Sequence, residues 1–140
     1  MAGQPKLIAL DLGERRIGLA VSGPGGLALP AGHIFRSKLT EDVQQVIDVA
    51  SERQAQGIVV GIPYTLRGET GPAAKLARRF IRALRKETTL PIHEMDERFT
   101  SVEAEGLLRE SGVQPSRDRA MVDETAAMLI LRRFMASQEV

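Results

Sequence analysis

Three strand-forming segments follow one another at the start of this chain, before any segment with helical periodicity appears. The apolar segment 6–11 is followed by 16–22 and by 27–36, with short turns between them. Strands joined by turns this short pair most easily as an antiparallel meander. We therefore expect the chain to begin with a three-stranded antiparallel unit, whose third strand is interrupted at Pro30.

The pattern then changes to helices that alternate with short apolar strands. Strands are expected at 57–61 and 90–95, and the parallel arrangement suits both. Helices are expected over four segments, namely one with Thr40 as its N-cap, 72–87, 100–112 and 118–136. This order predicts a mixed five-stranded sheet, antiparallel in its first three strands and parallel in strands four and five, with helices packed on it. It is the order of the ribonuclease H-like fold, and we expect residues 1–140 to form one such domain.

Two of the expected helices carry additional signals. Thr100 and Glu103 have the spacing of a capping box, which would open the third helix. The second helix is amphipathic, with an apolar side made of Leu76, Ala77, Phe80, Ile81 and Leu84. Its basic side holds Lys75, Arg78, Arg79, Arg82, Arg85 and Lys86. Such a side is either an ordinary solvated face or a track for nucleic acid.

Acidic residues stand in apolar surroundings at three places in the sequence. Asp11 ends the first apolar run, and Asp96 and Glu97 end the expected fifth strand. Asp123 shares one face of the last helix with the apolar residues Ala126, Ala127, Ile130 and Phe134. A carboxylate in such surroundings is costly unless it is paired, protonated or bound to a metal. We therefore expect these charges to meet at one site, although each residue also suits a plain turn or helix start.

The composition narrows what such a site can bind. Cysteine is absent, so any metal must be held by Asp, Glu or His, which favours the hard cations Mg²⁺ and Mn²⁺. No apolar run is long enough to span a membrane, and the N-terminus lacks the apolar core of a signal peptide. A cytoplasmic protein is expected, and the net charge of +1 says little about its partners.

Four blocks of the sequence resemble the YqgF/RuvX family. They are residues 10–22, 59–63, 96–104 and 123–131, and they occur in the order typical of that family. Its members are bacterial proteins related to the RuvC Holliday-junction resolvase and described as pre-16S rRNA nucleases. The resemblance runs from about residue 6 to residue 135. This chain differs in having Gly23 where many members have an acidic residue, and in the composition of the loop 64–68.

The resemblance implies a ribonuclease H-like nuclease that depends on Mg²⁺ or Mn²⁺. By position in the motifs, Asp11, Glu97 and Asp123 are the expected catalytic and metal-binding residues, and Asp96 is a further candidate ligand. The implied function is hydrolysis of phosphodiester bonds in 5′-end maturation of pre-16S rRNA, with nucleic acid and a ribosome precursor as partners. We expect a two-metal reaction, in which one ion activates water and the other stabilises the leaving oxygen.

A polyanionic substrate calls for cations near these acids. The candidates in or beside the motif loops are Arg15, Arg16, Arg67 and Arg98, and those on the second helix are Lys75, Arg78, Arg79 and Arg82. Arginine suits this role because its guanidinium binds phosphate in a bidentate manner, but each could also pair with a local acid. Tyr64 is the candidate for base stacking. His93, which precedes Glu94 on the expected fifth strand, could approach the site but is interpreted as structural.

Three other functions fit parts of the pattern. One is a Holliday-junction or branched-DNA resolvase, or a single-stranded DNA nuclease in repair. Another is a nucleic-acid-binding module on the same fold that has no catalytic activity. The third is an actin-like nucleotide phosphotransferase, because the sequence Asp11-Leu12-Gly13 after a first strand also opens that phosphate loop.

Overall fold

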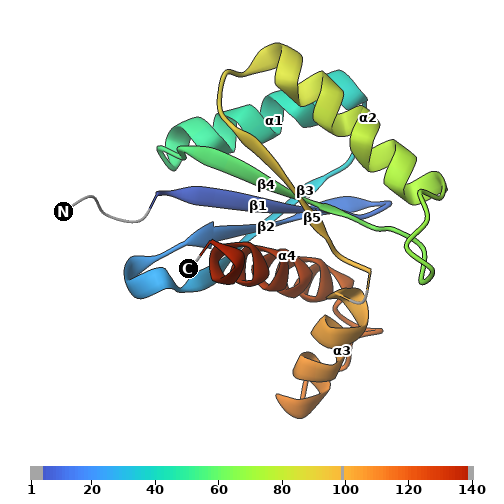
Figure 1. The fold of residues 1–140 in the computed structure, drawn as a ribbon. Coiled ribbons are helices and arrows are strands. Elements are labelled where there is room, and N and C mark those ends of the chain that lie inside the picture. The colour runs from blue at the N-terminus through green and yellow to red at the C-terminus, as the bar shows by residue number, and fades with distance from the viewer. Residues whose placement is uncertain (1–4, 99, 139–140) are drawn as a thin grey trace.

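A single five-stranded sheet forms the centre of the computed structural model, which describes residues 5–98 and 100–138 (Figure 1). Its strands are β1 (Leu7–Leu12), β2 (Arg16–Ser22), β3 (Ala28–Phe35), β4 (Gly57–Ile62) and β5 (Ile92–Asp96). Their order across the sheet is β3-β2-β1-β4-β5. The first three strands pair antiparallel, and β4 runs parallel to both β1 and β5. The expected mixed sheet is confirmed.

Helices cover both faces of this sheet. The helices are α1 (Leu39–Glu52), α2 (Pro72–Glu87), α3 (Thr100–Glu110) and α4 (Arg119–Ser137), and a short 3₁₀ turn spans Pro24–Gly26. Helices α1 and α2 lie on one face, α4 lies across the other, and α3 packs beside α4 (Figure 1). Among the described residues, no helix has the length and apolar character needed to cross a membrane.

The core has two layers, one on each side of the sheet. Apolar side chains of α1 and α2, including Val46 and Phe80, pack on one face of the strands. On the other face, Ile130 and Leu131 of α4 pack against Ala9 and Val59. This second layer places the C-terminal helix directly over the first strand, so it determines where Asp123 lies relative to Asp11.

The third strand is continuous through Pro30, where an interruption was expected. Proline removes one backbone donor from a sheet, and an edge strand tolerates that loss. Strand β3 is such an edge, and its pairing with β2 shifts register between Gly18 and Ala20 instead of breaking.

The expected start of α1 is wrong in detail, and α3 begins at Thr100 as expected but its capping side chains have other partners. Helix α1 has Lys38 as its N-cap, and Thr40 lies inside the first turn. The buried carboxylate of Asp42 reaches back to accept the backbone N–H of Ser37 at 2.9 Å, and so secures the entry to the helix. At α3 the Thr100 hydroxyl accepts a hydrogen bond from Arg133 at 3.0 Å, and Glu103 also pairs with Arg133. Both side chains of the expected capping box therefore hold α4, and residue 99 lies outside the described residues.

Helix α2 has the expected bounds, but Leu76 and Arg78 do not lie on the sides of the helix that were expected for them. Leu76 is 63% exposed, because Ala74 and Ala77 occupy the inner positions of that turn. Arg78 is half-buried and donates a hydrogen bond to the Tyr64 hydroxyl at 2.6 Å. Arg78 and Tyr64 therefore fasten the loop after β4 to the helix.

Candidate active site

A polar cavity of about 500 Å³ opens where β1 and β5 end and α4 begins. Parallel strands end at the same edge of a sheet, so Asp11 at the end of β1 and Glu97 just after β5 come together there. The backbone N–H of Glu97 donates to the carbonyl of Ile62 at 3.1 Å, which fixes Glu97 beside the end of β4. Asp123, in the second turn of α4, also lines the cavity, as does Glu14 in the turn after β1. The structure thus brings the three expected acids to one cavity.

Asp11 and Glu97 form a buried carboxyl pair. Each residue is only 6% exposed, and a hydrogen bond joins the two side chains. Burial raises the pKa of Glu97 to about 10, with the Asp11 charge adding to the rise. Burial also raises the pKa of Asp11 to about 6, against the opposing effect of the hydrogen bond with Glu97. Two carboxylates this close cannot both be charged without a counter-ion, so the pair keeps a proton at neutral pH.

A glycine in the neighbouring strand makes room for this pair. A Cβ atom at Gly61 of β4 would stand 2.8 Å from the carboxyl carbon of Glu97. Any larger residue there would push Glu97 away from Asp11. The acidic pair therefore depends on the small size of Gly61, which lies next to Glu97 in the structure although the two are far apart in sequence.

Asp123 reaches the site because α4 packs unusually close to β2. A side chain at Gly18 would overlap the backbone carbonyl of Asp123, so only glycine allows this approach. The Asp123 carboxylate lies 3.4 Å from the guanidinium of Arg16 and is 18% exposed. Burial raises its pKa, and the positive charges of Arg16 and Arg119 partly offset that rise. The absence of a side chain at Gly18 therefore serves the packing of α4 against the sheet.

Asp96 lies outside the lining of the cavity. Its carboxylate accepts hydrogen bonds from the Arg98 side chain at 2.9 Å and from the Arg98 backbone at 3.0 Å. Burial alone would raise the pKa of Asp96, but these bonds and the charge of Arg98 lower it overall. Asp96 is therefore occupied in holding Arg98, which itself lines the cavity.

The donor atoms of the site suit a hard divalent cation. Carboxylate oxygens are the ligands that Mg²⁺ and Mn²⁺ prefer. The proton shared by Asp11 and Glu97 neutralises one of their two negative charges, and a bound cation would do the same. Within residues 5–98 and 100–138, no three His, Asp or Glu side chains already stand close enough to hold a metal. Asp123 is the acid that stands apart, since it is paired with Arg16.

The expected cationic residues divide into two groups. Arg15, Arg16 and Arg98 line the cavity, as does Arg119, which the sequence interpretation missed. Arg119 lies one helical turn before Asp123, and that spacing is the signal that could have found it. The others do not reach the cavity: Arg67 is exposed in the loop after β4, Lys75, Arg79 and Arg82 are exposed on α2, and Arg78 bonds to Tyr64.

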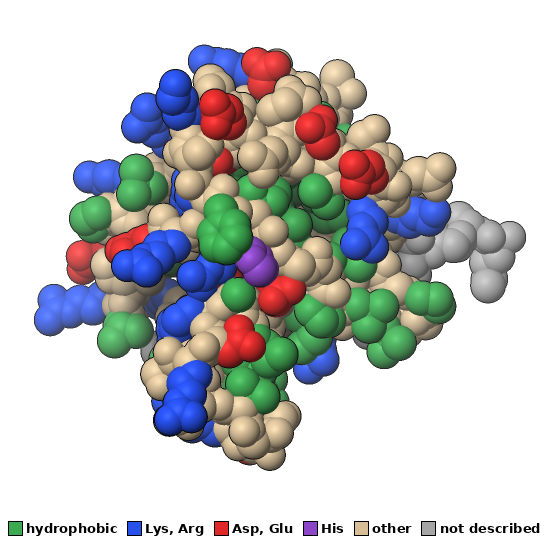
Figure 2. Space-filling model, turned by 180° about the vertical axis from the view of Figure 1, so that it is seen from behind, with side chains coloured by type: hydrophobic (Ala, Val, Ile, Leu, Met, Phe, Trp, Pro, Cys, Tyr) green, Lys and Arg blue, Asp and Glu red, His purple; other side chains and the backbone are tan. Residues whose placement is uncertain are grey.

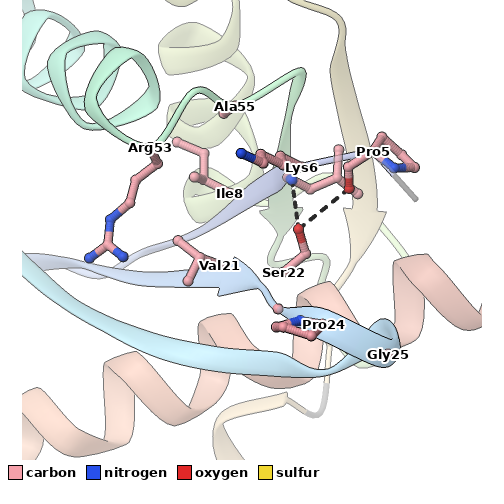
Figure 3. Close-up of a pocket in the computed structure, with 11 residues that line it drawn as sticks. Pro5, Lys6, Ile8, Val21, Ser22, Pro24, Gly25, Arg53 and Ala55 are labelled. Atoms are coloured by element: carbon pink, nitrogen blue, oxygen red, sulfur yellow. Dashed lines mark hydrogen bonds between the residues drawn. The ribbon is translucent and has the colours of Figure 1, made fainter. Parts of the chain in front are cut away.

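A larger cavity of about 600 Å³ lies between the start of β1 and the end of β2 (Figure 3). Its lining contains Lys6, Arg53 and Ser22 but no acidic residue. The Ser22 hydroxyl accepts the backbone N–H of Leu7 at 2.8 Å and donates to the carbonyl of Pro5 at 3.4 Å (Figure 3). Its hydroxyl is thus used within the fold, and the acidic cavity remains the candidate for chemistry.

Solved structures with the same arrangement place this fold in a known class. RuvC of Thermus thermophilus in complex with a Holliday junction is similar, with a TM-score of 0.60 at 14% identity over 96% of each chain. The fowlpox virus Holliday junction resolvase has a TM-score of 0.58 at 9% identity, over 96% of this chain and 99% of that one. The fold is therefore ribonuclease H-like, of the RuvC type.

Sequence comparison then gives the family. The RuvX family, described as "Holliday junction resolvase", matches residues 5–137. A relative from Acaryochloris marina is 39% identical over 129 residues, which cover 91% of this chain and 90% of the relative. One from Roseiflexus sp. is 38% identical over 140 residues and 99% of both chains. Both are named "Putative pre-16S rRNA nuclease". This chain belongs to the RuvX family.

Proposed function

We propose that this protein is a nuclease that hydrolyses phosphodiester bonds at the Asp11–Glu97–Asp123 site with the help of divalent metal ions. The observation that carries the proposal is the buried Asp11–Glu97 pair, because two buried carboxyl groups side by side are costly to the fold. Membership of the RuvX family supports it, because the relatives at 38–39% identity carry the name of a nuclease.

Each residue of the cavity has a role in this proposal. Asp11 and Glu97 would hold the metal and release the proton that they share. Asp123 would join them once Arg16 turns from its carboxylate to a substrate phosphate. When bound, two Mg²⁺ or Mn²⁺ ions would supply an activated water and a counter-charge for the leaving oxygen.

The positive residues around the acids would position the polyanionic substrate. Arg15 is exposed at the cavity rim, and Arg119 lies on the α4 side of the same cavity. Arg98 is already oriented by Asp96, so its guanidinium is held in place before a phosphate arrives. These contacts bind backbone phosphates, and they do not by themselves distinguish RNA from DNA.

The substrate that we propose is the 5′ region of pre-16S rRNA, within a ribosome precursor in the cytoplasm. The names of the relatives support this choice. A second candidate is a branched DNA such as a Holliday junction, which the description of the family and the RuvC-type fold favour. Both candidates use the same acidic site.

A cleavage panel tests the proposal. Wild type is incubated with a labelled pre-16S rRNA leader, single-stranded DNA and a Holliday junction, each with Mg²⁺ or Mn²⁺. We expect cleavage of the rRNA leader, and its loss in Asp11→Asn and Asp123→Asn. Asp48→Asn is the matched control, because Asp48 is exposed on α1. If Asp11→Asn is folded by circular dichroism and still cuts like wild type, the site is wrong, and if only the junction is cut, the second candidate holds.

A further inference from the structure

An exposed aromatic ring stands at the edge of the acidic site. Phe35, the last residue of β3, is 68% exposed. The other large hydrophobic side chains that are exposed in the described part of the chain are aliphatic. Burying a phenylalanine side chain stabilises a fold by roughly 2 kcal/mol, and the exposed Phe35 ring forgoes most of that stabilisation. A single exposed apolar residue is unremarkable, and its position decides whether it has a role.

The position of Phe35 ties it to the candidate catalytic residues. Phe35 is directly opposite Arg16 in the pairing of β2 with β3, and the Arg16 guanidinium carbon lies 6.0 Å from the centre of the ring. The same guanidinium lies 3.4 Å from Asp123. The Arg16 side chain therefore links the Phe35 ring to the Asp123 carboxylate of the acidic site.

A second ring supports the first. His33, two residues earlier on the same strand, packs edge-on against Phe35 with ring centres 5.0 Å apart. Its Nδ1 atom lies 3.9 Å from the carboxylate of Glu124, next to Asp123. His33 and Arg16 thus hold the phenyl ring on two sides while most of it stays exposed.

Hydrogen-bonding capacity is left over at this position. The buried Nε of Arg16 and the Nδ1 of His33 have no hydrogen-bond partner among the described residues. Buried polar atoms are normally satisfied, so these two unpaired atoms mark an incompletely bonded position beside the ring, and their burial keeps them from direct contact with a ligand. On the face shown in Figure 2, several basic side chains lie beside exposed hydrophobic ones, with acidic side chains close by.

We propose that Phe35, backed by His33 and Arg16, is a stacking platform for one unpaired nucleobase beside the phosphate to be cut. An aromatic face next to a guanidinium is the combination that binds single-stranded nucleic acid, because every base has a flat face to stack. Charge favours this occupant over an apolar protein surface, since the ring is bordered by a cation. The inference rests on the proposed nuclease function, and it makes a strand with an unpaired base at this position the preferred substrate.

Binding measured in EDTA tests the platform separately from cleavage. The probe is a fluorescent single-stranded RNA, and the variants are Phe35→Ala, Phe35→Leu and Phe35→Trp. Phe35→Ala should weaken binding on the order of tenfold. Phe35→Leu should be similarly weak because it keeps apolar cover without an aromatic face, and Phe35→Trp should bind like wild type. Leu29→Ala, at an exposed position of the same strand, is the matched control and should bind like wild type.

Abasic substitutions along the RNA give the decisive measurement. In wild type, removal of the base at one position should weaken binding as much as Phe35→Ala does, and in Phe35→Ala that removal should have no additional effect. Additive losses at every position, or wild-type binding by Phe35→Leu, would overturn the platform. So would a change of oligomeric state in Phe35→Ala with unchanged RNA affinity, because Phe35 would then be a protein contact. If wild type cuts no substrate but removal of the base has no additional effect in Phe35→Ala, the stacking platform is supported and the proposed nuclease function fails.

Discussion

At the scale of single residues, the buried carboxyls of Asp11 and Glu97 reduce the stability of the metal-free fold. Their elevated pKa values mean that the folded chain binds more protons than the unfolded chain above about pH 4. The free energy of unfolding of the metal-free protein therefore falls as the pH rises through about 6 and continues to fall above it. A cation at the site would replace the proton and remove this penalty.

The variant Glu97→Gln isolates that effect. In EDTA, wild type should lose stability between pH 5 and pH 8, on the order of 5 kcal/mol, whereas Glu97→Gln should lose much less. Adding Mg²⁺ or Mn²⁺ at pH 8 should stabilise wild type and leave the variant nearly unchanged. Urea unfolding at each pH gives the free energies. A variant that follows the wild-type pH profile would show that the pair is not the source of the dependence.

At the level of residues, the sequence predicted the acids better than it predicted their partners. Asp123 could be placed because helical spacing puts it on the apolar face of α4. The choice of Glu97 over Asp96 rested on the resemblance. The pairing of Arg98 with a local acid was an open alternative, and the structure shows that this acid is Asp96. Phe35 was missed because its neighbour Arg16 comes from another strand, and strand pairing sets that contact.

Close packing of α4 on β2 is the contact between elements that matters most for the site. Gly18→Ala should destabilise the fold by about 3 kcal/mol, because the new Cβ would overlap backbone atoms of Asp123, which cannot move aside as a flexible side chain can. Gly106→Ala in α3 is the control, since no atom stands within 4 Å of the Cβ it would add. That change should stabilise the protein by about 0.5–1 kcal/mol through helix propensity.

Thermal and urea unfolding of both glycine variants check this prediction. A Gly18→Ala protein as stable as wild type would mean that α4 sits farther from the sheet than the structure shows. Loss of cleavage together with retained stability would mean that the helix has shifted and carried Asp123 away from the site.

Elements with strong periodicity were predicted well, whereas the side-chain contacts at the starts of α1 and α3 were not. The bounds of α2 matched at both ends, because Gly71 and Pro72 mark its start and its apolar positions recur regularly. The start of α1 was misplaced because Asp42 bonds back to Ser37, a contact that competes with capping by Thr40. In α3, Arg133 from a distant helix engages both residues of the expected capping box, and local sequence contains no information about it.

Basic side chains of the molecule lie in two regions, one at the acidic cavity and one on α2. Arg15 lies at the acidic cavity, while Arg79 and Arg82 line a groove of about 470 Å³ between α1 and α2. Helix α4, which carries Asp123, lies on the other face of the sheet from that groove (Figure 1). The site and the basic side of α2 therefore offer separate surfaces for nucleic acid.

Salt dependence of binding distinguishes the two surfaces. Arg15→Gln should lower the slope of log affinity against log salt by about 1, because one phosphate contact is lost. The double variant Arg79→Gln/Arg82→Gln should leave the slope close to that of wild type. Filter binding of single-stranded RNA in EDTA over a range of salt concentrations provides the slopes. A larger loss from the double variant would place the nucleic acid along α2.

The acids of the site come from opposite ends of the chain, Asp11 from the first strand and Asp123 from the last helix. During translation, the ribosome releases β1 early, but α4 must leave the exit tunnel and dock on β2 before the site exists. A chain that lacks α4 therefore lacks Asp123 and cannot assemble the proposed site. The distance between these residues along the sequence thus delays assembly of the site until both β1 and α4 have been synthesised.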